Sequence, residues 1–308
     1  MTPGGLSDSR PSKNERREVA REKAKQLRID QKKKDRRNRV LLQGSIGVVA
    51  IAIVVIVAVV IMGSIRPAGP GPANMASDGI LIGEGMTAVE TTALQPDAAA
   101  QASEPDATGT VANIRVYVDY LCPFCGLFEL TNGEQIQSWV ESGAATVEIH
   151  PIAILTSKSA GSQYSLRAAN AAACVASSAP NDFYAFNAAL FTDQPEENTT
   201  GRSDAELKEV VAASGVTTNV SEIETCIDDT TYKTWVQEAT ERALSGPIAN
   251  SELEKITGTP TVLVDGKQYV GALDDPNEFS AFVLQAVGES YSTSTPTPTP
   301  TPEATPAG

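Results

Sequence analysis

The sequence predicts an α/β layer fold, and three observations lead to this prediction. Residues 114–118 form an apolar, β-branched run that is typical of a buried strand, and apolar residues then recur with a helix-like spacing over 126–140. A block of several helical patterns occupies the middle of the folded region. The chain finally returns to two short β runs around Asp265-Gly266, which is a strong hairpin signal. An apolar strand with helices around it is typical of layered α/β proteins.

The remaining elements follow in a definite order along the chain. A second strand is expected at 146–155, directly before the helical block. Proline, glycine, asparagine, aspartate or serine lies near the ends of the later elements, and Ser203 with Glu206 forms a capping box before one helix. The expected ranges of the five helices, the hairpin strands and the last helix are 163–177, 182–191, 204–214, 220–228, 232–245, 260–264, 267–270 and 277–287.

Charge is distributed unevenly, which indicates two compartments. Residues 1–40 carry 14 Lys+Arg and 6 Asp+Glu, a net charge of +8, whereas the rest of the chain carries a net charge of −22. Residues 40–62 are 23 uncharged and mostly apolar residues. At about 1.5 Å per residue they reach about 34 Å, enough to cross a hydrocarbon core of about 30 Å. The basic residues before this span predict a cytoplasmic N-terminus and an extracytoplasmic body.

The apolar span predicts an uncleaved anchor. A secretory signal has an apolar core of roughly 7–15 residues and a small-x-small cleavage site, whereas this run is longer and residues 62–66 offer no such site. A cleaved signal remains the alternative. The basic tail can bind nucleic acid in principle, but the span directly behind it favours contact with anionic lipid head groups, so no nucleic acid is expected as a partner. The expected location is therefore the cell membrane, with a single pass through the lipid bilayer.

Composition divides the chain into five segments. Proline and glycine after the span, and small residues beyond them, predict a flexible linker, and the final Thr-Pro tract cannot pack a core. The expected segments are a basic cytoplasmic tail (1–39), a transmembrane anchor (40–62), a linker with a candidate edge strand at 79–83 (63–110), a folded domain with a helical insertion at about 157–250 (111–290), and a disordered tail (291–308).

Two cysteines, Cys122 and Cys125, lie two residues apart where the first strand gives way to a helix. The sulfur of Cys122 is expected to face unpaired backbone N–H groups and the positive end of the helix dipole, which favour thiolate over thiol. A thiolate with a second thiol within reach supports disulfide exchange. All four cysteines lie on the outer side of the predicted span, where an even number fits disulfide chemistry.

The other two cysteines, Cys174 and Cys226, fall in the helical block, and one structural bridge between them is the simplest account. A second redox-active pair is the alternative. A zinc site needs four ligands, usually from paired C-x-x-C motifs or with histidine, but the chain has one C-x-x-C and one histidine, His150. We therefore expect no metal, and we expect His150, at a strand end before a proline, to be structural.

Two acidic residues, Asp119 and Glu129, flank the cysteine pair. Either carboxylate can assist proton transfer to or from Cys125 if it lies close enough. The alternative for each is a solvated surface carboxylate without a role in the chemistry.

The folded region resembles the DsbA-like branch of the thioredoxin superfamily, and in particular the membrane-anchored or secreted members from high-GC Gram-positive bacteria. The resemblance covers roughly residues 111–289. A C-x-x-C on a strand-to-helix turn together with a Thr-Pro before a hairpin is a specific combination. The motifs that carry it are YVDYLCPFCGLFE, HPIAIL, YSLRAANAAACV, TWV and GTPTVLVDGK.

The resemblance implies a thioredoxin fold with a helical insertion and the activity of a protein thiol–disulfide oxidoreductase. By the family motif, Cys122 is the attacking cysteine and Cys125 the resolving one. Pro260 corresponds to the cis-proline, and the backbone of Thr259 before it is expected to pair with an extended substrate strand. The chain departs from the family at Phe124, where the strongest oxidases carry histidine. A moderate oxidant is therefore expected.

The resemblance also implies partners and alternatives. We expect an oxidase that introduces disulfides into reduced or unfolded secreted proteins, works as a monomer without a cofactor, and is re-oxidised by a DsbB-like or vitamin K epoxide reductase-like membrane protein. A disulfide reductase or isomerase is the first alternative. The second is a non-catalytic module that binds client proteins and keeps its cysteines permanently bridged.

Overall fold

The computed structural model of the protein describes residues 21–23, 25–26, 28, 31–34, 69–106 and 108–294. The chain separates into two units, Met1–Pro67 and Ala68–Gly308, and the described residues of the first unit are helical and exposed. The predicted anchor at 40–62 and the tail beyond residue 294 lie outside the described residues. Within the described ranges, no helix combines the length and the apolar character that crossing a membrane requires.

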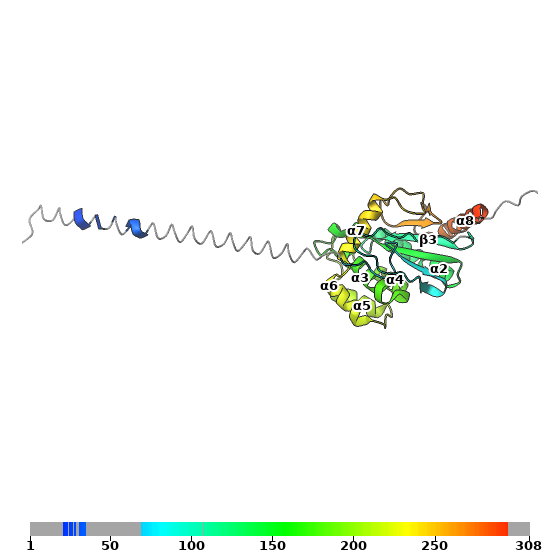
Figure 1. Ribbon diagram of the computed structural model, residues 1–308, viewed down its shortest axis with the longest axis horizontal. Helices are drawn as coiled ribbons and strands as arrows, with labels where there is room; N and C mark the ends of the chain where they lie inside the picture. Colours follow the sequence, from blue (N-terminus) through cyan, green and yellow to red (C-terminus); the bar gives the residue numbers. More distant parts are fainter. Residues whose placement is uncertain are drawn as a thin grey trace, which may run out of the picture. The chain divides into compact units, whose positions relative to one another are not determined.

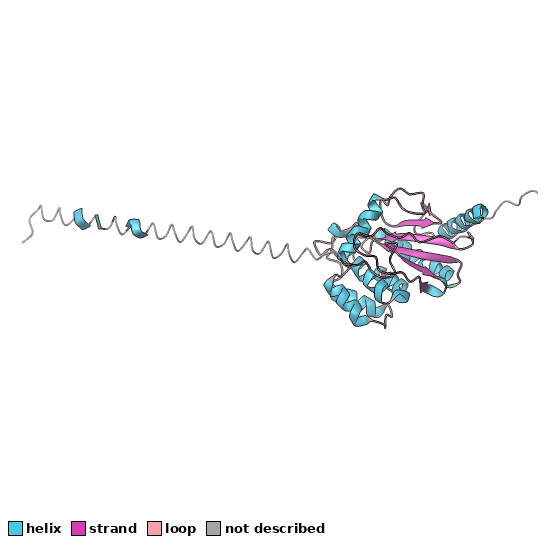
Figure 2. Cartoon of the chain, in the orientation of Figure 1, coloured by secondary structure: helices cyan, strands magenta, loops and turns pink. Residues whose placement is uncertain are grey.

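A six-stranded mixed sheet forms the centre of the second unit (Figure 2), with the strand order β2-β1-β4-β3-β5-β6. The strands are β1 (Ile80–Gly83), β2 (Thr87–Ala88), β3 (Ala112–Val118), β4 (Ala145–Pro151), β5 (Thr261–Val264) and β6 (Lys267–Gln268). β3 pairs in parallel with β4 and antiparallel with β5. Every residue of β3 and β5 is buried, as expected for strands near the middle of a sheet that is covered on both faces.

The predicted order of strand, helix, strand, helical block, hairpin and helix is confirmed. Helices α3 to α7 form an insertion between β4 and β5, and Figure 1 shows α5 and α6 on the side of this unit away from α8. The helices are α2 (Pro123–Glu141), α3 (Tyr164–Ser178), α4 (Phe183–Phe191), α5 (Asp204–Ala213), α6 (Val220–Asp229), α7 (Lys233–Ser245) and α8 (Pro276–Ser294), with short 3-10 helices η1 (Glu84–Met86), η2 (Thr156–Lys158) and η3 (Pro180–Asp182). Ser203 and Glu206 make both hydrogen bonds of the predicted capping box.

Helices cover both faces of the sheet and fix where α2 begins. On one face α2 and α8 pack together, and the rings of Phe128 and Phe279 meet edge to face with centroids 5.2 Å apart. On the other face Tyr117 and Leu263 pack against Ala243 of α7. Because β3 is buried from both sides, its C-terminal end and the start of α2 are held firmly at one edge of the core.

Residues 69–106 belong to the folded unit, so the prediction of a flexible linker over 63–110 is wrong for this stretch. β1 lies inside the sheet, where it pairs antiparallel with β4, and β2 forms the edge in place of the expected edge strand at 79–83. Ile80 and Ile82 are at most 1% exposed. The small residues of this segment suggested flexibility, but strand pairing and a few buried apolar side chains order it, and neither is visible in composition.

Candidate functional site

The two cysteines lie on the first turn of α2. This helix begins at Pro123, and Cys122 is its N-cap; proline suits the first helical position because no partner is needed for the N–H that it lacks. The N–H groups of Cys125 and Gly126 donate to the carbonyl oxygen of Cys122 at 3.1 and 3.2 Å. Between the cysteines, Phe124 is 61% exposed. The thiols are not joined to each other in this structure.

A second loop meets this turn. The Cys122 thiol donates a hydrogen bond to the carbonyl oxygen of Thr259 at 3.2 Å, and the Thr259–Pro260 peptide bond is cis. The cause of the contact is strand pairing: Thr261, at the start of β5, lies opposite Tyr117 near the end of β3. The loop before β5 must therefore lie beside the turn after β3.

The environment of Cys122 favours its thiolate. The pKa of Cys122 is lowered to about 6, chiefly by the neighbouring Cys125 thiol, then by the hydroxyl of Thr259 and the backbone N–H groups of Cys125 and Phe124, while burial acts in the opposite direction. The Thr259 hydroxyl is buried near the sulfurs, and no hydrogen-bond partner is found for it among the described residues. The sequence predicted that the start of the helix favours the thiolate of Cys122. The structure adds the side chains of Cys125 and Thr259, which also lower the pKa of this thiol.

The environment of Cys125 favours its protonated thiol instead. The residue is 1% exposed, and burial, together with the nearby Cys122, raises the pKa of the Cys125 thiol well above its ordinary value. Near neutral pH the pair therefore carries its charge on Cys122 and its proton on Cys125. This asymmetry makes Cys122 the better nucleophile and the better leaving group.

Asp119 does not occupy the solvated position that was one alternative. Its carboxylate is buried and accepts hydrogen bonds from the backbone N–H of Leu121 (2.9 Å), the backbone N–H of Leu155 (2.8 Å) and the hydroxyl of Ser165 (2.7 Å). Burial raises the pKa of this carboxyl despite these bonds. Both oxygens are thus engaged in holding the turn that precedes the cysteines.

Glu129 lies one helical turn after Cys125, on the same side of α2. Its Oε1 is buried without a hydrogen-bond partner, and burial raises the pKa of the carboxyl to about 7, with Asn187 acting in the opposite direction. The hydroxyl of Tyr120 donates to Asn187 Oδ1 at 3.0 Å in the same region. A carboxyl that changes protonation near neutral pH therefore lies on the same helix as the buried cysteine, one turn further along.

The other two cysteines form a disulfide away from this pair. Cys174 of α3 is bonded to Cys226 of α6, with Cα atoms 5.9 Å apart and a sequence separation of 52. Cys174 is completely buried. The bridge ties two helices of the insertion together, as in the structural reading of the sequence.

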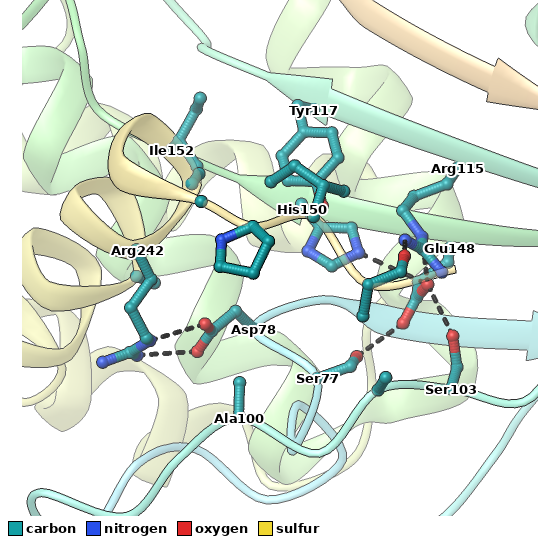
Figure 3. A pocket seen from close by; sticks show the side chains of 17 residues that line it. Ser77, Asp78, Ala100, Ser103, Arg115, Tyr117, Glu148, His150, Ile152 and Arg242 are labelled. Atoms are coloured by element: carbon teal, nitrogen blue, oxygen red, sulfur yellow. Dashed lines mark hydrogen bonds and ion pairs between the residues drawn. The ribbon is translucent and has the colours of Figure 1, made fainter. Parts of the chain in front are cut away.

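A separate charged cluster surrounds a cavity of about 190 Å³ beside α7 (Figure 3). At its centre the buried carboxylate of Glu148 accepts hydrogen bonds from Arg115 Nε (2.9 Å), Ser77 (2.5 Å) and Ser103 (2.8 Å). Both serines belong to 69–106. The cluster therefore attaches that segment to β3 and β4, which accounts for the burial of these charges.

His150 belongs to the same cluster. It is 3% exposed, its ring stacks on Tyr117 with centroids 4.4 Å apart, and its Nε2 lies 3.4 Å from Glu148 Oε2. These contacts agree with a structural role for His150. Among the residues that the structure describes, no group of three or more His, Cys, Asp or Glu side chains is arranged to hold a metal ion.

One residue that contacts the cysteine turn could not be recognised from the sequence. Gln194, in the loop between α4 and α5, donates from Nε2 to the carbonyl oxygens of Tyr120 (3.0 Å) and Cys122 (2.9 Å). A polar residue in a loop is ordinary, and only the folded arrangement shows that this one reaches the turn that carries the cysteines.

Known proteins share this fold. A protein-family model described as thioredoxin matches residues 104–284, more than half of the chain. Reduced DsbA from Mycobacterium tuberculosis is similar with a TM-score of 0.51 and 28% sequence identity, over 71% of this chain and 100% of that chain. The reduced form of the disulfide bond oxidoreductase DsbG from the same organism gives a TM-score of 0.50 and 28% identity, over 74% and 96% of the two chains.

A curated relative is the serine/threonine-protein kinase PknE of Mycobacterium tuberculosis. It is 33% identical over 166 residues, which make up 52% of this chain. The chain spans only 28% of that kinase's length.

Proposed function

The chain belongs to the thioredoxin family and is a protein thiol–disulfide oxidoreductase of the DsbA type, and from this premise we propose that it oxidises secreted proteins with Cys122 and Cys125 as its active site. One observation carries the proposal: the pKa of Cys122 is lowered to about 6 while that of Cys125 is raised. A stabilised thiolate on one cysteine makes the disulfide between the two easy to break, and therefore oxidising.

The proposed reaction moves two electrons from a client to the enzyme. A client thiolate attacks the sulfur of Cys122 in the Cys122–Cys125 disulfide, the bond between the two cysteines breaks, and Cys125 leaves and takes up a proton. A second client thiolate then attacks the client sulfur of the mixed disulfide. A disulfide forms in the client and Cys122 leaves as a thiolate, which its environment stabilises.

Clients are proposed to bind in extended form across Thr259. Its carbonyl oxygen is the acceptor of the Cys122 thiol in the reduced structure, so main-chain pairing at Thr259 brings a client cysteine beside the reactive sulfur. Phe124 and Leu127 are 61% and 41% exposed next to the cysteines. They offer apolar contact to the unfolded proteins that expose apolar side chains.

Glu129 is proposed to exchange the proton of Cys125. Its carboxyl has a pKa of about 7 and one oxygen without a partner, whereas both oxygens of Asp119 are occupied. A group whose pKa lies near the working pH is suited to accept and return a proton.

The proposed setting is the outer face of the cell membrane. Residues 40–62 are proposed as the anchor, with the catalytic domain extracytoplasmic, and a DsbB-like or vitamin K epoxide reductase-like membrane protein as the re-oxidant. A monomer without nucleic acid is proposed. Because Phe124 offers no side-chain donor to the thiolate, we propose a moderate oxidant, with a potential between about −270 and about −120 mV.

Trapping of clients tests this function. In cells that produce Cys125→Ala, mixed disulfides between Cys122 and secreted proteins are expected to accumulate, and the double variant Cys122→Ala/Cys125→Ala is expected to show none. A client-binding module without redox chemistry would trap nothing with either variant. The resting state of the pair decides the direction: mostly oxidised cysteines support an oxidase, and mostly reduced cysteines would establish the reductase alternative.

A further inference from the structure

The helical insertion contacts the cysteine turn through the side chain of Gln194. Its single amide nitrogen donates to two backbone carbonyls, those of Tyr120 and Cys122. The Cys122 carbonyl also accepts from the N–H groups of Cys125 and Gly126. This oxygen is therefore one point at which α2 and the insertion are joined, and it belongs to the residue that carries the proposed nucleophile.

The chain provides space for this contact at Gly126. A Cβ built at Gly126 would clash with Gln194 Oε1. Glycine inside a helix costs roughly 0.5–1 kcal/mol relative to alanine, so its presence in the first turn of α2 calls for a local reason. The close approach of Gln194 supplies one.

The loop that carries Gln194 is held from its other side by Arg202. The guanidinium group donates hydrogen bonds to the carbonyl oxygens of Leu190, Thr192 and Asp193. Three bonds from one side chain fix the backbone directly before Gln194. The amide is thus presented to the cysteine turn by an ordered loop.

We infer that Gln194 is a positioning residue, through which the helical insertion sets the reactivity of Cys122. The amide brings partial positive charge to the Cys122 carbonyl and fixes the first turn, so that the N–H groups of Phe124 and Cys125 keep facing the sulfur. Without Gln194 the two carbonyls lose a donor, and the turn is held by fewer hydrogen bonds. The thiolate of Cys122 then loses part of its stabilisation. This inference rests on the proposed role of Cys122.

Alkylation of the reduced full-length protein as a function of pH tests the inference. For Gln194→Ala we expect the alkylation rate at pH 6 to fall roughly threefold, because a weaker environment for the thiolate leaves less of it at that pH. Gln194→Glu, which has the same shape but no donor when ionised, is expected to fall as well. Glu196→Ala, in the same loop and exposed, is the control and should keep the wild-type profile.

A double-mutant cycle with Gly126 sharpens the test. Gly126→Ala should displace the Gln194 side chain and lower the rate at pH 6 in the same way. The double variant Gly126→Ala/Gln194→Ala is then expected to be no slower than either single variant, since both remove one interaction. Fully additive losses would show that the two residues act separately and would overturn the inference.

The outcomes separate this inference from the proposed function. If wild-type Cys122 titrates near pH 6 and both Gln194 variants follow the same profile, only the role of Gln194 is wrong, and a loss of thermal stability alone would mark the contact as structural. If the wild-type protein itself titrates near pH 8.5, like ordinary cysteine, the proposed function fails first.

Discussion

The thiol of Cys122 lies 3.2 Å from the carbonyl oxygen of Thr259, although 137 residues separate them in the sequence. The pairing of β3 with β5 brings these two loops together. The carbonyl with which a client strand is proposed to pair therefore lies beside the reactive sulfur. A client bound there in extended form would bring its cysteine within reach of Cys122.

Substitution of Thr259 by valine tests the contribution of its hydroxyl. Thr259→Val keeps the shape and the backbone carbonyl but removes the hydroxyl that helps to lower the pKa of Cys122. We expect the midpoint of Cys122 alkylation to move to higher pH. Thr261→Val is the matched control, because the Thr261 hydroxyl bonds to the Gly258 carbonyl and not to a sulfur. An equal shift in both variants would contradict the assignment.

The stability of the protein should depend on the protonation of Glu129. Burial raises the pKa of this carboxyl from its ordinary value of 4.5 to about 7, so the folded state holds the proton more tightly than the unfolded state. The contribution of Glu129 to stability is therefore fully present below pH 4.5 and is lost as the pH rises through 7. Glu129→Gln, which stays neutral, should be more stable than wild type at pH 8 by up to roughly 3 kcal/mol.

Chemical denaturation at several pH values checks the Glu129 prediction. The difference in unfolding free energy between Glu129→Gln and wild type should be small at pH 4 and should grow towards pH 8. Gln in place of Glu134, an exposed glutamate of the same helix, is the control. A difference that does not change with pH would contradict a buried, neutral carboxyl at Glu129.

Loss of the second disulfide should affect stability but not thiol chemistry. A variant with alanine at both Cys174 and Cys226 is expected to unfold more easily by up to about 4 kcal/mol, from the loop that the bridge closes. Alkylation of Cys122 should keep its wild-type pH profile. Mass spectrometry of a non-reduced digest should recover the Cys174–Cys226 link; a link between Cys122 and Cys174 would contradict this arrangement.

The buried cluster around Glu148 should hold the N-terminal segment in place. Arg115→Met leaves the carboxylate without its cation in a buried site, which typically costs about 3–5 kcal/mol. We expect residues 69–106 to become sensitive to a protease under conditions in which the wild type resists. Lys208→Met, which breaks a surface pair with Asp228, should leave this resistance unchanged. Equal sensitivity of both variants would contradict the role of the cluster.

The sequence was sufficient for the elements whose signals are local. Every end of the five helices of the insertion was predicted to within one residue, because proline, glycine and capping residues such as Ser203 mark them. The last helix runs on to Ser294, since nothing interrupts a helix between 287 and the first proline of the tail. That residues 69–106 are folded was not predicted, because their structure depends on pairing with β4 and on the hydrogen bonds of Ser77 and Ser103 to Glu148.

In the candidate site too, the sequence revealed some residues and only the folded structure revealed others. Cys122, Cys125 and Thr259 could be named because their spacing and setting are part of a motif. The state of Glu129 and the contact of Gln194 could not be predicted, because burial and a contact across 72 residues of chain appear only after folding. Asp119 could be identified from the sequence, but its role could not be predicted, since its hydrogen bonds to the backbone form only in the folded turn.

The pH dependence of Cys122 alkylation in the reduced wild-type protein tests the central claim most directly. The pKa of Cys125 is raised well above its ordinary value, so this thiol stays protonated over the pH range of the test and the rate should report Cys122. We expect a half-maximal rate near pH 6, in line with the lowered pKa of the Cys122 thiol. A midpoint near 8.5, the value of an unperturbed cysteine, would contradict it.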